Sequence, residues 1–421
     1  MAEVKVKRTE TSRLVKAAVT NHWNNIRQAH AEGRPIAWGA GGMLLLTDAM
    51  DIPTHFMGGY GAFCAGTGGG TMLLKAAEDA KFLPETCSYH RIHLGDIHLI
   101  KQGALPEERW YLPPPDLITL VRLCPEHSHY AEALYRQFKV PVISVEVPSL
   151  VSEDEFDYAV DFVEKQFWAA IPEVEKFCGK PFRWDRLSQI LQWIKDAGTY
   201  RKECWDLAKN IPAPCTMMDF SASHGMILYG FGPHQVEFFR KLKEELEQRV
   251  AQGIAAVPGE KYRLMWDSII PWHNLRLLPS RMAATKTNFL MGRYIHEMIP
   301  HPELLDPEHP LHTIAEQNVR YWCPIMLPSS SPTGGATWVA NAIKDYHIDG
   351  LVMHNIRTCR IYTIGQQDVA MEMDERFNVP YVIIEGDMAD PQFFSEAQFD
   401  TRLQALLETI DARRAEGIER P

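Results

Sequence analysis

Three cysteines lie where a thiolate could bind a metal ion or an iron–sulfur cluster. Cys124 and Cys359 each follow an apolar run that predicts a β-strand, and each precedes a stretch with helical spacing. Cys87 opens the segment CysSerTyrHisArgIleHisLeuGly at a predicted helix N-terminus. Open α/β sheets bind ligands at the carboxyl ends of their strands, and a helix N-terminus lowers the pKa of a thiol. These cysteines are therefore the first candidates for chemistry.

The spacing of the cysteines limits which metal centre they could form. No Cys-x-x-Cys pair occurs in the chain, so a zinc ribbon and a bacterial-type ferredoxin are not indicated. Three thiolates brought together from separate domains could hold one iron–sulfur cluster. Zinc is an alternative, because Cys87-x-x-His90 and Cys124-x-x-His127 have the spacing of a site with two cysteines and two histidines. That site would leave Cys359 without a role, and the histidines could equally be surface or capping residues.

The other cysteines are weaker candidates. The chain has eight in all. Cys64 lies in a glycine-rich run and Cys323 follows a predicted helix, so either could supply a further ligand. The remaining three lie in or beside helical stretches and are predicted to be core residues, since a free cysteine packs as a small hydrophobe: Cys178, Cys204 and Cys215.

Composition narrows the class of protein. The net charge of −11 is unfavourable for binding nucleic acid, because no broad positive field would hold phosphates. No stretch approaches the roughly 20 apolar residues that a membrane helix needs, and the N-terminal residues lack the apolar core of a signal peptide. We therefore expect a cytoplasmic protein that binds neither nucleic acid nor membrane. Disulfide frameworks are rare in that compartment, which favours metal binding or catalysis for some of the cysteines.

Two glycine-rich runs, 58–71 and 329–335, invite comparison with phosphate-binding loops. Neither has the GxGxxG order with an acidic partner or the Lys-Ser/Thr of a P-loop. We predict that both are loops near a bound ligand or cluster, with plain surface turns as the alternative. No GxSxG elbow or Ser-His-Asp order indicates a hydrolase. Candidate proton donors are His224, His354, Glu385 and Asp387.

A long-range repeat predicts the elements that position the cysteines. In each half of the chain an apolar run, a cysteine and a helix-like stretch precede Phe-x-Val-Pro and a second apolar run; the two copies are 116–148 and 347–387. Continuous apolar strands are typical of parallel sheets that are covered on both faces. We therefore predict an α/β fold with two similar parallel-sheet domains, flavodoxin-like or Rossmann-like, and an intervening helical block.

The predicted elements and boundaries follow from apolar periodicity and from Pro and Gly positions. Residues 1–150 would form an N-terminal helix and the first α/β domain with Cys87 and Cys124. Residues 151–257 would form the helical block, and 258–421 the second α/β domain with Cys359. The predicted helices are 10–32, 87–103, 127–139, 153–176, 183–209, 234–252 and 396–416, and the predicted strands begin near 35, 116, 141, 262 and 381.

Over nearly its whole length the chain resembles the superfamily of 2-hydroxyacyl-CoA dehydratases and class I, ATP-dependent benzoyl-CoA reductases. The resemblance rests on GluThrCysSerTyr around Cys87, on LysTyrArgLeuMetTrp, on AspGlyLeuValMetHisAsnIleArgThrCys up to Cys359, and on ValProTyrValIleIleGluGlyAsp. The run from Asn355 through Gln366 is more similar to the larger cluster-bearing subunit of benzoyl-CoA reductases (the B/O type) than to dehydratase subunits.

This resemblance implies a [4Fe–4S] cluster bound by Cys87, Cys124 and Cys359, with one iron lacking a cysteine ligand. It also implies a hetero-oligomer with a sister cluster-bearing subunit and with ATPase subunits that activate electrons from reduced ferredoxin. Family reductases of anaerobic aromatic degradation add single electrons to an aromatic acyl-CoA, converting benzoyl-CoA to cyclohexa-1,5-diene-1-carbonyl-CoA. Dehydratases expel a hydroxyl group through a ketyl radical.

Other interpretations of the resemblance stay open. Relatives with a double-cubane cluster need about twice as many thiolates, and recruiting Cys64 and Cys323 would still leave the set one short of six. The chain could instead be a 2-hydroxyacyl-CoA dehydratase subunit, or a zinc-stabilised or metal-free acyl-CoA-binding scaffold that supports a catalytic partner. The expected function is an oxidoreductase subunit of the benzoyl-CoA reductase type.

Overall fold

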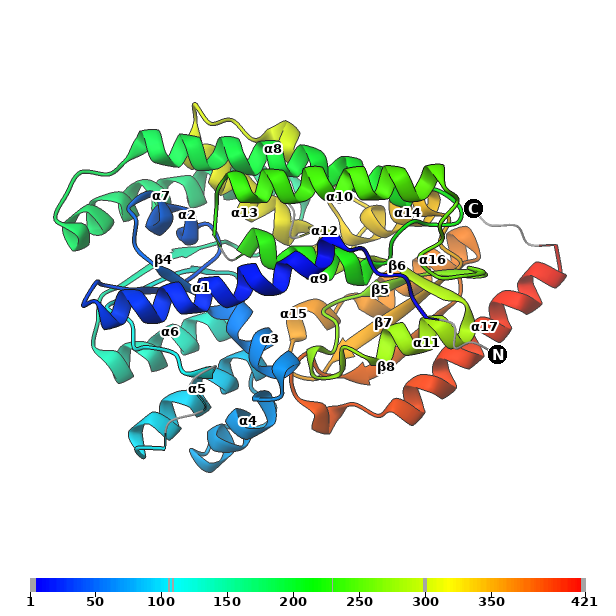
Figure 1. Ribbon diagram of the computed structural model, residues 1–421, viewed down its shortest axis with the longest axis horizontal. Helices are drawn as coiled ribbons and strands as arrows, with labels where there is room; N and C mark the ends of the chain where they lie inside the picture. The colour runs from blue at the N-terminus through cyan, green and yellow to red at the C-terminus, as the bar shows by residue number, and fades with distance from the viewer. Residues whose placement is uncertain (1–4, 105–106, 108–109, 229, 298–300, 418–421) are drawn as a thin grey trace.

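The computed structural model describes residues 5–104, 107, 110–228, 230–297 and 301–417. Figure 1 shows two lobes, each built around a β-sheet, with the long helices α8 and α10 running along one side of both. The α-helices of the described residues are α1 (Leu14–Ala31), α2 (Met43–Ala49), α3 (Met57–Thr67), α4 (Gly70–Asp79), α5 (Ser88–Lys101), α6 (Pro125–Phe138), α7 (Phe156–Cys178), α8 (Trp184–Ala208), α9 (Met217–Leu228), α10 (Pro233–Ala251), α11 (Leu277–Thr285), α12 (Arg293–Glu297), α13 (Pro310–Met326), α14 (Gly335–Tyr346), α15 (Arg360–Thr363), α16 (Gln366–Phe377) and α17 (Glu396–Ala415).

The first sheet has four parallel strands in the order β2-β1-β3-β4. They are β1 (Ala37–Ala40), β2 (Thr54–Phe56), β3 (Leu117–Arg122) and β4 (Val142–Glu146). Strand β3 lies between two neighbours and is buried at every position before Arg122. This burial is the reason that its sequence is a continuous apolar run rather than an alternating one.

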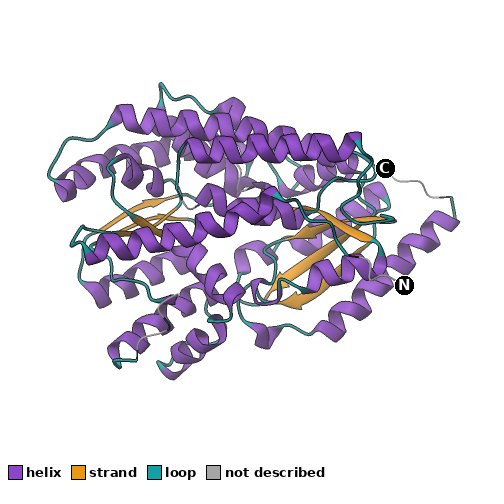
Figure 2. Cartoon of the chain, viewed as in Figure 1, coloured by secondary structure: helices purple, strands orange, loops and turns teal. Residues whose placement is uncertain are grey.

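The second sheet repeats this arrangement with β5 (Tyr262–Asp267), β6 (Thr287–Gly292), β7 (Gly350–Ile356) and β8 (Tyr381–Gly386). Its strands are also parallel, and the order β6-β5-β7-β8 matches that of the first sheet strand for strand. The predicted α/β fold with two parallel sheets is therefore confirmed. The strands are visible in Figure 2 as two separate groups surrounded by helices.

The helices of the middle of the chain cover both lobes. Helices α8 and α10 pack along each other, and α2 of the first lobe also packs on α8. Helix α13 comes late in the chain but packs against α7, so that Ile314 and Val319 share a core with Val163 and Phe167. The last third of the chain thus contributes to the core of the first lobe as well as building the second sheet.

Two expectations about local structure are wrong. The glycine-rich run 58–71 is not a loop, because it forms most of α3 and the start of α4. At Gly61 a Cβ atom would lie 2.6 Å from the ring of Tyr89, so the glycine serves close packing of α3 on α5. Cys323 does not follow a helix but lies within α13, whose sequence continues through Pro324.

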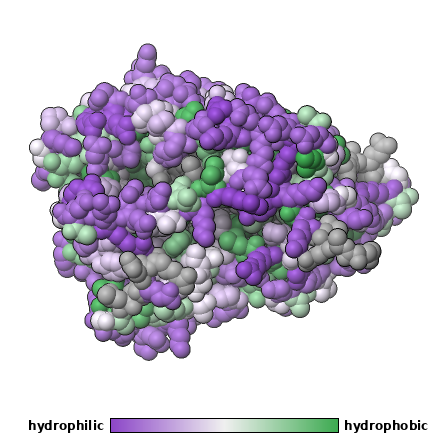
Figure 3. Space-filling model, in the orientation of Figure 1, coloured by the Kyte–Doolittle hydropathy of each residue, from purple (hydrophilic) through white to green (hydrophobic). Residues whose placement is uncertain are grey.

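The exterior is mostly polar. In Figure 3 hydrophilic side chains dominate the face shown, and the hydrophobic ones form small, scattered patches. Among the residues that the structure describes, no helix combines the length and the apolar character needed to cross a membrane.

Candidate functional site

Cys87, Cys124 and Cys359 occupy the same local position and line one cavity. Each is the N-cap residue of a helix: Cys87 of α5, Cys124 of α6 and Cys359 of α15. Cys124 lies in the short turn between β3 and α6, and Cys359 in the turn between β7 and α15, so the strand-to-helix turns of both sheets point toward the same space. The cavity has a volume of about 500 Å³ and its walls include all three cysteines.

The thiols lie in an environment that disfavours isolated negative charge. Burial raises the pKa of Cys124 to about 11 and that of Cys359 to about 12, and it holds the pKa of Cys87 well above its ordinary value. Negative charge on Cys359 and Cys124 would raise the pKa of Cys87 further. The backbone N–H of the third residue of each helix acts in the opposite direction and lowers the thiol pKa; these residues are His90, His127 and Tyr362.

This environment suits a cationic group between the cysteines. Three neighbouring thiols with raised pKa values ionise together most readily around positive charge, and metal binding releases their protons. The three helix N-termini supply N–H groups that favour thiolates. A cluster with three cysteine ligands fits this donor set, since the three sulfur atoms come from three separate helices around one cavity.

Hydrogen bonds tie the two lobes together beside the cysteines. The backbone N–H of Ser88, next to Cys87, donates to Thr358 Oγ1 at 3.2 Å, and Thr358 Oγ1 in turn donates to Asp387 Oδ2 at 2.5 Å. A buried ion pair also crosses from α5: Arg91 Nη2 lies 2.5 Å from Asp390 Oδ2. These contacts fix Cys87 relative to Cys359. Sequence reasoning missed Thr358, although its position directly before Cys359 was a usable signal.

The cavity walls are largely apolar and rich in aromatic rings. Tyr294 lies 5.9 Å from Tyr362 between ring centroids, and Trp322 lies 4.9 Å from Tyr321. The Tyr321 and Tyr362 hydroxyl groups are 3.3 Å apart. On the other wall the ring of His90 stacks on a further tyrosine, Tyr130, at 4.1 Å. Such walls exclude water and contact flat or apolar acyl groups.

The histidines expected for a zinc site are engaged in the cavity wall. His127 Nδ1 accepts the backbone N–H of Leu123 at 3.1 Å, and His90 Nδ1 faces Glu126 Oε2 at 3.8 Å. In the described part of the chain, no three His, Cys, Asp or Glu side chains are grouped closely enough to hold one metal ion, and this applies to the three cysteines as much as to the two-cysteine, two-histidine set. The contacts of His90 and His127 with their own surroundings are therefore the observation that disfavours the zinc site.

The remaining sequence candidates with described side chains do not line the cavity. Cys64 and Cys323 are fully buried in separate apolar cores and do not line it. His354 is buried with Nδ1 2.6 Å from the Ile269 carbonyl oxygen, and Glu385 is exposed on β8. Asp387, a candidate proton donor, accepts hydrogen bonds from the backbone N–H and the hydroxyl of Thr358 within the second lobe, and Thr358 is the residue that contacts Ser88 of the first lobe. The side chain of His224 lies outside the described part of the structure.

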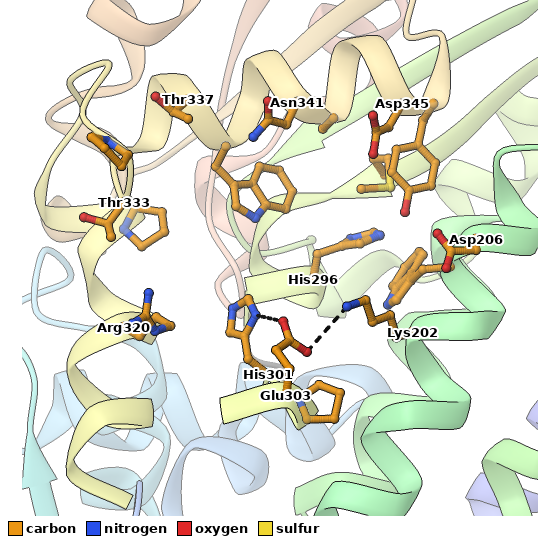
Figure 4. Close-up of a pocket in the computed structure, with 18 of the residues that line it drawn as sticks. Lys202, Asp206, His296, His301, Glu303, Arg320, Thr333, Thr337, Asn341 and Asp345 are labelled. Carbon is orange, nitrogen blue, oxygen red and sulfur yellow. Dashed lines mark hydrogen bonds and ion pairs between the residues drawn. The ribbon is translucent and has the colours of Figure 1, made fainter. Parts of the chain in front are cut away.

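A second cavity of about 600 Å³ borders the neighbouring face of α8. Its wall includes part of the predicted loop 329–335, which is a loop here but borders this cavity rather than the cysteines. Figure 4 shows that its charged groups meet one another: Lys202 Nζ lies 3.5 Å from Glu303 Oε2, and His301 Nδ1 lies 3.4 Å from Glu303 Oε1. Gly198 borders both cavities.

Comparison with known proteins now connects this site to a family. The family model described as "2-hydroxyglutaryl-CoA dehydratase, D-component" matches residues 46–410. That span contains both sheets except β1, and all three cysteines of the cavity. The chain belongs to the 2-hydroxyglutaryl-CoA dehydratase D-component family.

Curated relatives of this family member cover most of its length. Lactoyl-CoA dehydratase subunit alpha of Anaerotignum propionicum is 27% identical over 406 residues, 92% of this chain and 94% of the relative. The alpha subunit of (R)-2-hydroxyisocaproyl-CoA dehydratase of Clostridioides difficile is 25% identical, over 95% of this chain and 96% of the relative. One subunit of the benzoyl-CoA reductase of Thauera aromatica is also 25% identical, over 82% of this chain and 81% of the relative. The superfamily resemblance is therefore confirmed, and overall identity does not separate its two branches.

Proposed function

We propose that this chain is the iron–sulfur subunit of an enzyme that transfers single electrons to a CoA thioester, with a [4Fe–4S] cluster on Cys87, Cys124 and Cys359. The supporting observation is that three N-cap cysteines from two sheets line one apolar cavity. When bound, the cluster would supply low-potential electrons and one iron without a cysteine ligand. The residues of the chain would orient the thiolates with helix N–H groups and exclude water with the aromatic wall.

We propose aromatic acyl-CoA reduction, of the benzoyl-CoA type, as the reaction. The tyrosine and tryptophan rings around the cavity support an aromatic acyl group, because ring–ring contacts add to the burial of its surface. The similarity of 355–366 to the larger benzoyl-CoA reductase subunit supports the same choice. A sister cluster-bearing subunit, ATP-hydrolysing activator subunits and reduced ferredoxin belong to this proposal, as does a cytoplasmic location.

Dehydration of a 2-hydroxyacyl-CoA is the second candidate. Its support is the similarity to dehydratase alpha subunits, three of which cover more of the chain than the reductase subunit does. The two reactions are separated by assaying the complete complex with reductant, ATP and two thioesters. Formation of a cyclic dienoyl-CoA from benzoyl-CoA supports the reductase, and formation of an enoyl-CoA from a 2-hydroxyacyl-CoA supports the dehydratase.

The cluster assignment is tested by anaerobic purification. We expect brown protein with broad visible absorbance and about four irons per chain. Cys359→Ser should bleach the protein, whereas Cys178→Ser, at the end of α7 and away from the cavity, should keep its iron and colour. A colourless wild-type chain that contains zinc or no metal would refute the proposal and favour the non-redox scaffold.

A further inference from the structure

One face of helix α8 forms the part of the cavity wall that belongs to the helical block. Ile194, Ala197, Gly198 and Arg201 follow one another at the i, i+3, i+4, i+7 spacing of a single helical face, and all four border the cavity. Helix α10 contributes Phe239 to the same wall. Arg201 is therefore a cation placed at the end of an otherwise uncharged stripe.

The guanidinium of Arg201 is buried and largely without partners. The residue is 1% exposed. Nη2 donates to the carbonyl oxygen of Ile295 at 2.9 Å, whereas Nε and Nη1 have no hydrogen-bond partner. The ring of Phe239 lies 5.8 Å away. Within the described residues, no Asp or Glu oxygen forms an ion pair with Arg201.

The other fully buried arginines of the described core are paired, and Arg360, the second arginine that borders the cavity, is exposed. Arg91 and Arg263 are also fully buried, and they form ion pairs with Asp390 and Glu260 respectively. Lys202, the next residue on α8, faces the second cavity and meets Glu303 (Figure 4). Arg201 thus differs from the paired buried arginines in having no counter-charge, and from Arg360 in being buried.

An unpaired buried cation is costly to the fold. Burying a charged group without a counter-charge costs several kcal/mol. Burial lowers the pKa of Arg201 to about 9, so the side chain still carries its charge at pH 7. An anion that enters the cavity would recover this cost and would form charge-assisted hydrogen bonds in a nonpolar environment.

We propose that Arg201 binds an anionic oxygen group of the CoA thioester, and this inference rests on the proposed function for the class of ligand. The shared chemistry is that of a carboxylate or a phosphate, both of which accept from guanidinium N–H groups. A carboxylate would be carried by the acyl chain, and a phosphate would be part of CoA. Nε and Nη1 are the donors without a partner, and because both are buried, the side chain must turn toward the cavity to present them to either group.

The test is equilibrium dialysis of the anaerobic complex, without reductant or ATP, against butyryl-CoA, succinyl-CoA and S-butyryl-pantetheine. Arg201→Gln removes the charge, and Arg201→Lys keeps it. Lys202→Gln is the matched control, because it removes a cation from the adjacent position that faces the other cavity. Iron content and colour are recorded for each sample, so that failure of the cluster assignment is distinguished from failure of this inference.

Two results support the inference. If wild type prefers succinyl-CoA to butyryl-CoA and Arg201→Gln abolishes the preference, the anion is an acyl carboxylate. If Arg201→Gln weakens butyryl-CoA binding by about 10-fold to 100-fold but leaves S-butyryl-pantetheine unchanged, the anion is a CoA phosphate. In both cases Arg201→Lys should retain part of the affinity and Lys202→Gln all of it.

One result overturns it. If Arg201→Gln and Arg201→Lys both bind the three thioesters as wild type does, Arg201 has no role in ligand binding. Thermal unfolding gives a second check, because removal of an unpaired buried charge should leave the ligand-free protein as stable or more stable. A large loss of stability in both variants, with unchanged affinity in the folded fraction, would identify Arg201 as a purely structural residue.

Discussion

Thr358→Val should loosen the connection between the two lobes at the cysteine site. Thr358 Oγ1 accepts the backbone N–H of Ser88 at 3.2 Å and donates to Asp387 Oδ2 at 2.5 Å. Valine has nearly the same shape but neither hydrogen-bonding function. Because Ser88 follows Cys87 and Thr358 precedes Cys359, the substitution acts on the relative position of those two cysteines without changing any thiol.

The magnitude follows from the hydrogen bonds that are lost. Asp387 keeps three backbone donors, Thr358 at 3.2 Å and Ala389 and Asp390 at 3.0 Å each, so its carboxylate stays hydrogen-bonded. The bond to the charged oxygen contributes about 1.5–3 kcal/mol, and leaving the Ser88 N–H buried and unpaired costs about 1–3 kcal/mol. A total of about 2.5–6 kcal/mol should lower the thermal midpoint of the affected lobes by roughly 5–15 °C.

The assay is thermal unfolding of the anaerobic protein, together with the rate at which a chelator removes iron. Thr47→Val is the control, since Thr47 is equally buried but its hydroxyl donates to carbonyl groups within its own helix, those of Met43 and Leu44. We expect Thr358→Val to lose iron faster and to melt earlier than the control. The reasoning is refuted if the two variants show the same midpoint and the same rate of iron loss.

Three further perturbations should change stability in directions that the structure fixes. Arg91→Met removes the ion-pair partner of the buried Asp390 carboxylate and should lower the free energy of unfolding by about 3–5 kcal/mol. In denaturant unfolding, the double variant Arg91→Met/Asp390→Asn should recover part of this loss. Burial raises the pKa of the Asp96 carboxyl group to about 8, whereas in the unfolded state this group releases its proton near pH 4. The free energy of unfolding therefore decreases as the pH rises from about 4 to about 8. Asp96→Asn should therefore raise the thermal midpoint more at pH 8 than at pH 5, and equal effects at both would contradict the argument. Gly95→Ala places a Cβ atom 1.8 Å from the Leu73 carbonyl oxygen, so it should separate α4 from α5 and lower the thermal midpoint by several degrees. An unchanged midpoint would mean that the two helices move apart without a loss of stability.

Much of the fold could be predicted because its signals are local. Strand β3 is buried along its length, so it requires an apolar run that is recognisable without any partner. Helices α5 and α6 begin close to where the sequence predicts them, directly after Cys87 and Cys124. The repeat of strand, cysteine, helix and strand predicts two similar sheets, and their strand orders match.

The glycine-rich run 58–71 marks the limit of such local reasoning. Glycine favours loops in isolation, yet α3 forms there because its glycines allow close contact with Tyr89 on a neighbouring helix. The position of Cys323 relative to α13 is missed for a similar reason, since the proline that follows it is unfavourable inside a helix and yet α13 continues to Met326. Packing against a distant element overrides propensity in both cases.

The candidates for binding a cluster are recognisable in the sequence alone, because a cysteine at a strand-to-helix turn is a local feature. That Cys87, Cys124 and Cys359 line one cavity while Cys64 and Cys323 do not follows from the folded structure. The tertiary structure also places Asp387 as the hydrogen-bond acceptor of Thr358, the residue that contacts Ser88 of the other lobe, and leaves Arg201 without a counter-charge. Pairing of charges and convergence of helix ends depend on contacts between residues far apart in the chain, and no local period encodes those contacts.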